Sequence, residues 1–66
     1  MTPKYPNVEV ELTNQDGNAF AILARVRRAL RKNKVLPREI KQFVKEATAG
    51  DYDNLLQTIF QWVNVN

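Results

Sequence analysis

A chain of 66 residues forms one domain, whose small core supplies only about 3–5 kcal/mol of net stability. Cys, His and Ser are all missing, which excludes disulfides, the usual His/Cys zinc sites, and Ser or Cys nucleophiles with a His base. The formal net charge is +3, but the nine Lys or Arg and one acid from Arg25 to Lys45 give that segment +8 and leave −5 elsewhere.

The N-terminal part predicts an extended arm and then a strand. Pro3 and Pro6 keep residues 1–7 out of helical conformations. The sequence VEVEL at 8–12 alternates apolar and acidic side chains, the period of a half-buried strand. The Asp-Gly pair that follows is typical of a turn, and Asn18 is a good N-cap for the next element.

Three helices are predicted after the turn, over 18–32, 37–49 and 51–63. Pro37 suits the first position of the second helix, Gly50 its C-terminal stop, and Asp51 the cap of the third. Apolar residues at helical spacing predict a core that includes Leu23, Val26, Phe43, Leu55 and Ile59.

The fold expected is therefore mainly α, of the α+β class, with one short N-terminal strand followed by a three-helix bundle over 1–66. The lone strand needs partners for its backbone N–H and C=O groups. Three alternatives stay open at this point: the C-terminal WVNV pairs with VEVEL, a second copy does so, or the segment packs as an extended arm.

The first predicted helix carries a cluster of cations that is a candidate contact for phosphate or for a partner protein. Phosphate binding is one interpretation, and the ordinary polar face of an amphipathic helix is the other, which we favour. A DNA-reading helix-turn-helix is disfavoured because its second helix would present Asp51 and Asp53 and no cation to the major groove. The cluster consists of Arg25, Arg27, Arg28, Arg31, Lys32 and Lys34.

Large aromatic residues supply a second candidate surface. Phe20 projects away from the apolar stripe of its helix, and Phe60 and Trp62 lie at opposite edges of the wide apolar face of the last helix. Aromatic residues are enriched at protein interfaces. We therefore expect Phe20, Phe60 and Trp62 to be candidate interface residues of a protein complex or a homodimer.

Enzymatic signals are almost absent from the sequence. The four Thr residues have no neighbouring base, and the acid pairs are explained by a solvated strand face and by a helix N-terminus. We predict no catalytic residues, metal site, cofactor or small-molecule substrate. The N-terminus has no apolar signal region and no apolar run spans a bilayer, so we expect a soluble cytoplasmic protein without membrane contact.

The segments YPNVEVEL, DGNAFAIL, VRRAL and GDYDNLLQT together resemble a family of small bacterial and phage- or plasmid-associated proteins of unknown function. The resemblance implies a prokaryotic cytoplasmic protein and brings no activity and no site residues. The function expected is a non-enzymatic protein-binding or adaptor module that self-associates or binds another protein. The alternative is weak, sequence-independent nucleic-acid binding through Arg25 to Lys45.

Overall fold

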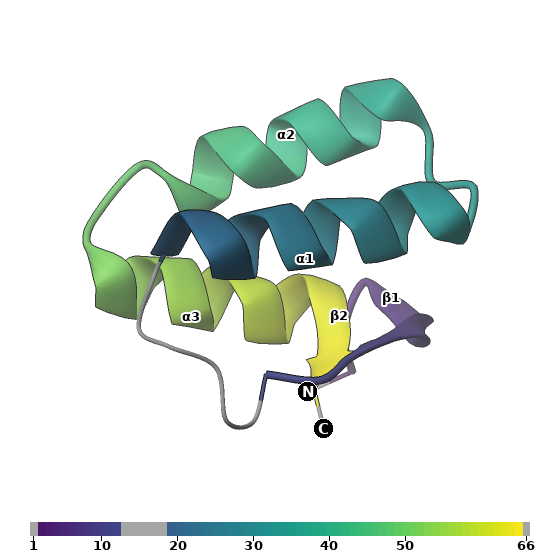
Figure 1. Cartoon of the computed structure of the whole chain (residues 1–66), viewed down its shortest axis with the longest axis horizontal. Coiled ribbons are helices and arrows are strands. Elements are labelled where there is room, and N and C mark those ends of the chain that lie inside the picture. Colours follow the sequence, from purple (N-terminus) through teal and green to yellow (C-terminus); the bar gives the residue numbers. More distant parts are fainter. Residues whose placement is uncertain (1, 13–18, 66) are drawn as a thin grey trace.

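The computed structural model describes residues 2–12 and 19–65 of the chain (Figure 1). Its elements follow the order β1 (Tyr5–Val10), α1 (Ala19–Lys32), α2 (Pro37–Ala47), α3 (Tyr52–Trp62) and β2 (Val63–Val65). The protein thus has the predicted mainly α, α+β architecture, an N-terminal strand followed by three helices. The turn predicted before α1 and its Asn18 cap lie outside the described residues.

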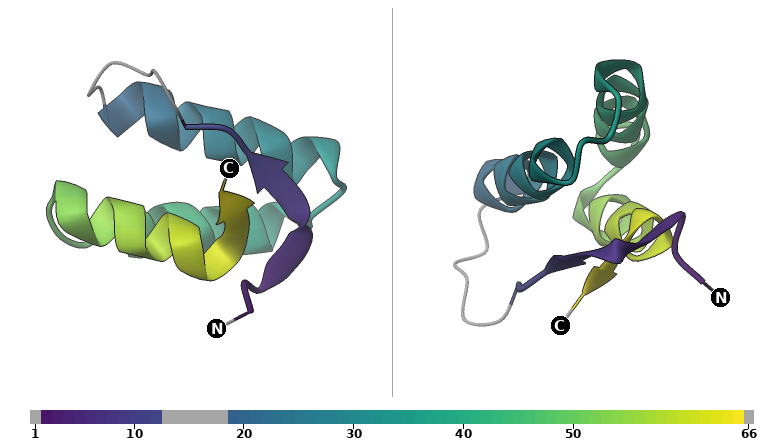
Figure 2. Two further views of the ribbon diagram at one scale, coloured as in Figure 1. Left: turned by 90° about the horizontal axis from the view of Figure 1, so that it is seen from below. Right: turned by 90° about the vertical axis from the view of Figure 1, so that its right-hand side faces the viewer.

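The helices form a bundle that the two strands cover on one side. Seen end-on, α1, α2 and α3 occupy the corners of a triangle, and the strands lie along the side formed by α1 and α3 (Figure 2). β2 directly follows α3 and pairs with β1, so the two strands lie at the C-terminal end of α3 (Figure 1). Among the described residues, no strand covers the side between α1 and α2 (Figure 2).

The strands answer the question of what VEVEL pairs with. β1 pairs in parallel with β2, with Tyr5 opposite Val63 and Val10 opposite Val65. The register is irregular between Tyr5 and Glu9, where Pro6 has no N–H to donate. The strand therefore begins earlier than predicted, at Tyr5 within the expected arm, and it ends at Val10. Its partner is inside the chain, which was the first of the three alternatives.

α1 ends in a turn that is unusual in its residue type. The Val35 N–H donates to the Leu30 carbonyl and the Lys34 N–H donates to the Arg31 carbonyl, both at 3.0 Å. These two bonds form a Schellman motif, which needs a left-handed residue at its centre, usually Gly. Here Lys34 takes that position, with a φ of 63°.

The corner between α2 and α3 is built by side chains. Asp51 caps α3 as predicted, since its Oδ1 accepts from the Asn54 N–H at 3.0 Å. The Asn54 side-chain amide donates in turn to the Glu46 carbonyl at 3.0 Å, near the C-terminal end of α2. Gly50 was predicted to end the second helix, and this prediction was wrong. α2 ends at Ala47 with Thr48 as its C-cap, and Gly50 has no positive φ.

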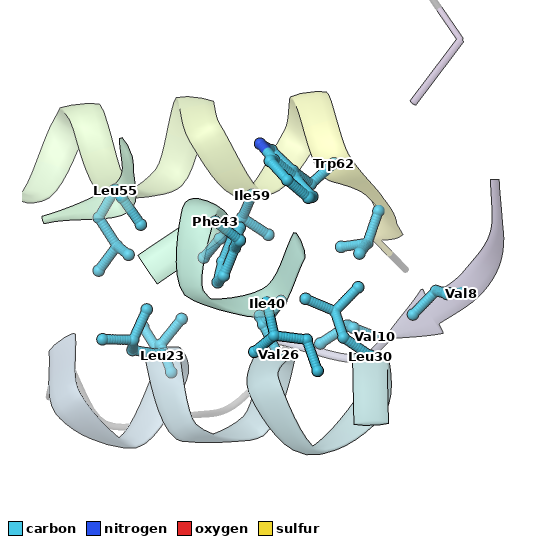
Figure 3. Close-up of a cluster of buried hydrophobic side chains, with 13 residues drawn as sticks. Val8, Val10, Leu23, Val26, Leu30, Ile40, Phe43, Leu55, Ile59 and Trp62 are labelled. Atoms are coloured by element: carbon cyan, nitrogen blue, oxygen red, sulfur yellow. The ribbon is translucent and has the colours of Figure 1, made fainter. Parts of the chain in front are cut away.

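A single core lies between the helices and the sheet (Figure 3). All five residues predicted for it are buried, and Val26, Phe43 and Ile59 have no exposed surface. The inward side of β1, Val8 and Val10, closes the core from the sheet, as its alternating pattern predicted. Trp62 also lies in this core, 3% exposed, with its ring edge-on to Phe43 at 5.5 Å between centroids.

Candidate binding surfaces

The six cations predicted as a contact are all exposed, but the structure does not bring them to one surface. Arg27 and Arg31 line a groove between α1 and α2. Lys34 lines a separate hollow beside the start of β1. The other three, Arg25, Arg28 and Lys32, line neither of these two. Arg27 and Arg31 therefore line a different hollow from Lys34, which follows the end of α1.

The groove between α1 and α2 gathers further cations from the second helix. α2 contributes Arg38, Lys41 and Lys45, which follow the i, i+3, i+7 spacing of one helix face. Its apolar floor consists of Val35, Pro37, Ile40 and Val44. Among the described residues, those lining this groove include five Lys or Arg and no acid. We call this surface the basic groove.

The acids of α2 are held away from the basic groove by specific contacts. Glu39 accepts from the Tyr5 hydroxyl at 3.1 Å and pairs with the Lys4 ammonium at 2.8 Å. Glu46 accepts from the Gln42 amide at 2.8 Å and from the Trp62 indole N–H at 3.1 Å. Both carboxylates thereby have partners in the N-terminal segment, in Gln42 and in α3, and neither lines the groove. Among the groove cations, the charge of Arg38 also helps to lower the pKa of Glu39.

The electrostatics of these contacts favour charged carboxylates. The hydrogen bond from Lys4, and then that from Tyr5, lowers the pKa of Glu39 below its ordinary value. The hydrogen bond from Gln42, followed by that from Trp62, lowers the pKa of Glu46. The hydrogen bond to Glu39 raises the pKa of Lys4, and burial is the main reason that the pKa of Tyr5 is raised.

The N-terminal segment is fastened to the bundle by Lys4. Its ammonium lies 4.3 Å from the centroid of the Trp62 ring, a cation–π distance, and its backbone N–H donates to the Gln61 carbonyl at 2.8 Å. Together with the ion pair to Glu39, these contacts join the N-terminal segment to α2 and α3. We call this cluster of Lys4, Tyr5, Glu39, Glu46 and Trp62 the Lys4 clasp.

The three aromatic residues predicted at an interface have different positions. Phe20 is 82% exposed and Phe60 is 56% exposed, in keeping with a surface role. The prediction for Trp62 was wrong, because its ring is in the core. Its indole N–H donates to the Glu46 carboxylate, and the Lys4 ammonium lies over its ring face. The N–H therefore keeps a hydrogen-bond partner although the side chain is buried.

The structure also adds residues to the aromatic surface that the sequence prediction missed. Tyr52 is 42% exposed and Leu56 is half-buried, and together with Phe60 they follow i, i+4, i+8 spacing along α3. A small hollow between the first turns of α1 and α3 places Phe20 near Tyr52. The i+4 spacing was visible in the sequence, but it was assigned to a wide core face. We call Tyr52, Leu56 and Phe60 the α3 stripe.

Within residues 2–12 and 19–65, no group of three His, Cys, Asp or Glu side chains could hold a metal ion. The hydroxyls of Thr48 and Thr58 donate to the carbonyls four residues earlier, which is an ordinary helical use of threonine. In the same part of the chain, no helix has the length and apolar character needed to cross a bilayer.

Comparison with known proteins returned no match to a family model, a curated protein or a solved structure. The resemblance to small bacterial and phage- or plasmid-associated proteins therefore stays a prediction. The basic groove, the Lys4 clasp and the α3 stripe are the features of the described residues that bear on function.

Proposed function

We propose that this protein is a non-enzymatic protein-binding module, and that its basic groove holds an acidic amphipathic helix of a partner. The observation that carries the proposal is the combination of five cations with an apolar floor and no acid in the lining. A prokaryotic, cytoplasmic setting belongs to the same proposal.

Helices bind proteins by laying an apolar face into an apolar groove, with charges at the rim setting orientation. Val35, Ile40 and Val44 offer the apolar floor, and the five cations form the rim. Phosphates alone would need the cations but not the floor. A partner that carries both carboxylates and apolar side chains uses every part of the groove, which is why a protein is favoured over a nucleic acid.

The test is the binding of a fluorescein-labelled helical peptide of about 15 residues, with Glu and Leu along one face, followed by anisotropy. We expect saturable binding that weakens with salt. The double variant Arg27→Glu with Lys41→Glu reverses charge on both walls of the groove and should weaken binding by about tenfold, or about 1.4 kcal/mol. A peptide with Gln in place of Glu should bind the wild-type groove no more tightly than the Glu peptide binds the double variant.

The matched control is Arg28→Glu with Lys32→Glu, which makes the same charge change on α1 outside the groove. Peptide affinity should fall by less than about threefold, because only the long-range field changes. Equal losses in the two double variants would contradict a groove site and indicate general charge attraction.

Weak, sequence-independent nucleic-acid binding is the second candidate, favoured by the exposed Arg28, Lys32 and Lys34 beyond the groove. In this case a labelled DNA duplex replaces the peptide. Counterion release predicts an affinity that falls steeply with salt, and both double variants should lose affinity alike. Tight duplex binding at physiological salt, with no peptide binding, would replace the first proposal by the second.

A further inference from the structure

We infer that the occupant of the basic groove is the α3 stripe of a second copy of this chain, in a head-to-tail contact. The inference rests on the proposed function of the groove and names its partner. It departs from the dimer expected from the sequence, because β1 already has β2 as its partner and Trp62 is buried.

The α3 stripe is an apolar surface of the right kind. Phe60 and Tyr52 are large side chains that keep about half of their surface exposed, although small domains need every apolar contact. They share one flank of α3 with Leu56, next to the face that carries the buried Leu55, Ile59 and Trp62. A rigid, already folded helix therefore presents aromatic side chains without any ordering cost.

Charge complementarity selects the basic groove as the surface that receives this stripe. From Gly50 to Asn66 the sequence contains Asp51 and Asp53 and no Lys or Arg. Both acids are exposed at the start of α3, beside Tyr52. The groove has the reverse composition, five cations and no acid among its described lining residues. Two stripes facing each other would bring no opposite charges together, because this region has no Lys or Arg, whereas a stripe in the groove meets opposite charge.

The dimensions and positions of the two surfaces also agree. α2 and α3 are each 11 residues long, or about 16 Å, so one helix can lie along the other. The groove is formed by α1 and α2 with the connection between them, and the stripe belongs to α3, so one copy can use both at once. A contact between two different surfaces leaves a free groove and a free stripe on every pair, so it continues into open chains or closes into a ring of several molecules.

The experiment combines sedimentation equilibrium with complementation. The wild-type chain should show a mean mass that rises with concentration past that of a dimer, and this rise should diminish with added salt. The groove variant is Arg27→Glu with Lys41→Glu, and the stripe variant is Phe60→Lys. Each alone should associate at least about tenfold more weakly than the wild type.

Mixing the two variants gives the decisive result. The groove variant keeps an intact stripe and the stripe variant keeps an intact groove, so an equimolar mixture should form a complex that stops at twice the chain mass. An isologous stripe-to-stripe dimer predicts instead that the groove variant dimerises alone and the mixture gains nothing. That pattern would overturn the inference.

Matched controls separate these effects from misfolding and from net charge. Gln61→Lys adds the same charge as Phe60→Lys one residue along, on another side of α3, and should associate like the wild type. Phe60→Gln removes the ring without adding charge and should also weaken association. Thermal melts by circular dichroism should remain cooperative in all variants, since every substituted side chain is exposed.

Two results distinguish self-association through the groove from peptide binding by the groove. A wild-type chain that stays monomeric at high micromolar concentration, while its groove still binds the acidic peptide, would overturn the inference and leave the proposed function standing. A chain that neither self-associates nor binds the peptide would overturn both.

Discussion

Lys34 stands where the local backbone favours glycine. Its φ of 63° lies in the left-handed region, which costs a residue with a Cβ roughly 1–2 kcal/mol relative to the right-handed helix. The Schellman hydrogen bonds from Val35 and Lys34 hold it there, and the Val35 side chain lines the apolar floor of the basic groove. These hydrogen bonds therefore offset the strain at Lys34 and set the direction in which the chain enters α2.

Replacing Lys34 with Gly should consequently stabilise the protein. We expect Lys34→Gly to raise the free energy of unfolding by about 0.5–1 kcal/mol, because Gly adopts positive φ freely. For a domain of this size that corresponds to a rise in Tm of roughly 2–8 °C, measured by circular dichroism. Arg28→Gly, at an exposed position in the interior of α1, should have the opposite sign, since Gly inside a helix is destabilising. A lower Tm for Lys34→Gly would mean that the lysine side chain contributes more than its backbone costs.

Side-chain hydrogen bonds at the helix ends join α2 to α3, in addition to the apolar contacts of the core. The Asn54 backbone N–H donates to the Asp51 side chain that caps α3, and its side-chain amide donates to the Glu46 carbonyl in the last turn of α2. A second contact from the same amide reaches the Ala47 carbonyl at 3.5 Å. Those carbonyls have no partner inside their own helix. Gly50 allows this close approach, because a Cβ there would lie 3.0 Å from the Asn54 Cβ.

Asn54→Asp is the sharp test of this corner. It keeps the size of the side chain but replaces the donating amide by a carboxylate that faces two carbonyl oxygens. We expect a loss of about 1–3 kcal/mol in urea denaturation, since both carbonyls lose the Asn54 donor and meet a negative charge, and the Glu46 carbonyl keeps only the Ala49 N–H at 3.3 Å. Gln57→Glu, which adds the same charge at an exposed position on α3, should change the stability by less than about 0.5 kcal/mol. Similar losses in both variants would assign the effect to net charge.

The helices were predictable because their signals are local. Ile22, Leu23, Val26 and Leu30 repeat at helical spacing, and Pro37 and Asp51 mark starts that depend only on neighbouring residues. The pairing of β1 with β2 joins segments from the two ends of the chain, and the sequence left it as one of three alternatives. The burial of Trp62 was missed for the same reason, since it depends on Glu46 in α2 and Lys4 in the N-terminal segment.

The candidate sites were predictable only as a list of residue types. The sequence identified the excess of cations from Arg25 to Lys45, but it did not assign them to sides of the bundle. Packing of α1 against α2 selects Arg27, Arg31 and three residues of α2 for one groove. Whether a cation lines that groove depends on the rotation of each helix about its axis, which tertiary contacts set.

At the scale of the whole molecule, the Lys4 clasp decides where the acids of α2 lie. Because the pKa of Glu39 and of Glu46 is lowered in the folded state, their contribution to stability is present above their ordinary pKa values. It is lost as the pH falls through the lowered values. The raised pKa of Lys4 and of Tyr5 has the opposite sense, so their contribution is present below their ordinary values and is lost as the pH rises. The clasp therefore stabilises the fold between these limits.

Removing the ammonium of Lys4 should change the two carboxyl groups unequally. In Lys4→Met, the pKa of Glu39 should rise toward its ordinary value, because the hydrogen bond from Lys4 is the main cause of its lowering. The pKa of Glu46 should rise less, since Gln42 and Trp62 still donate to it. Carboxyl ¹³C chemical shifts across an acid titration measure both pKa values, and the fluorescence of Trp62, the one tryptophan, reports the loss of the cation.

Lys41→Met removes a groove cation as a control and should leave the pKa of Glu39 nearly unchanged. An equal rise at Glu39 and Glu46 in Lys4→Met would mean that Lys4 acts as a distant charge and not as the fastening of the clasp.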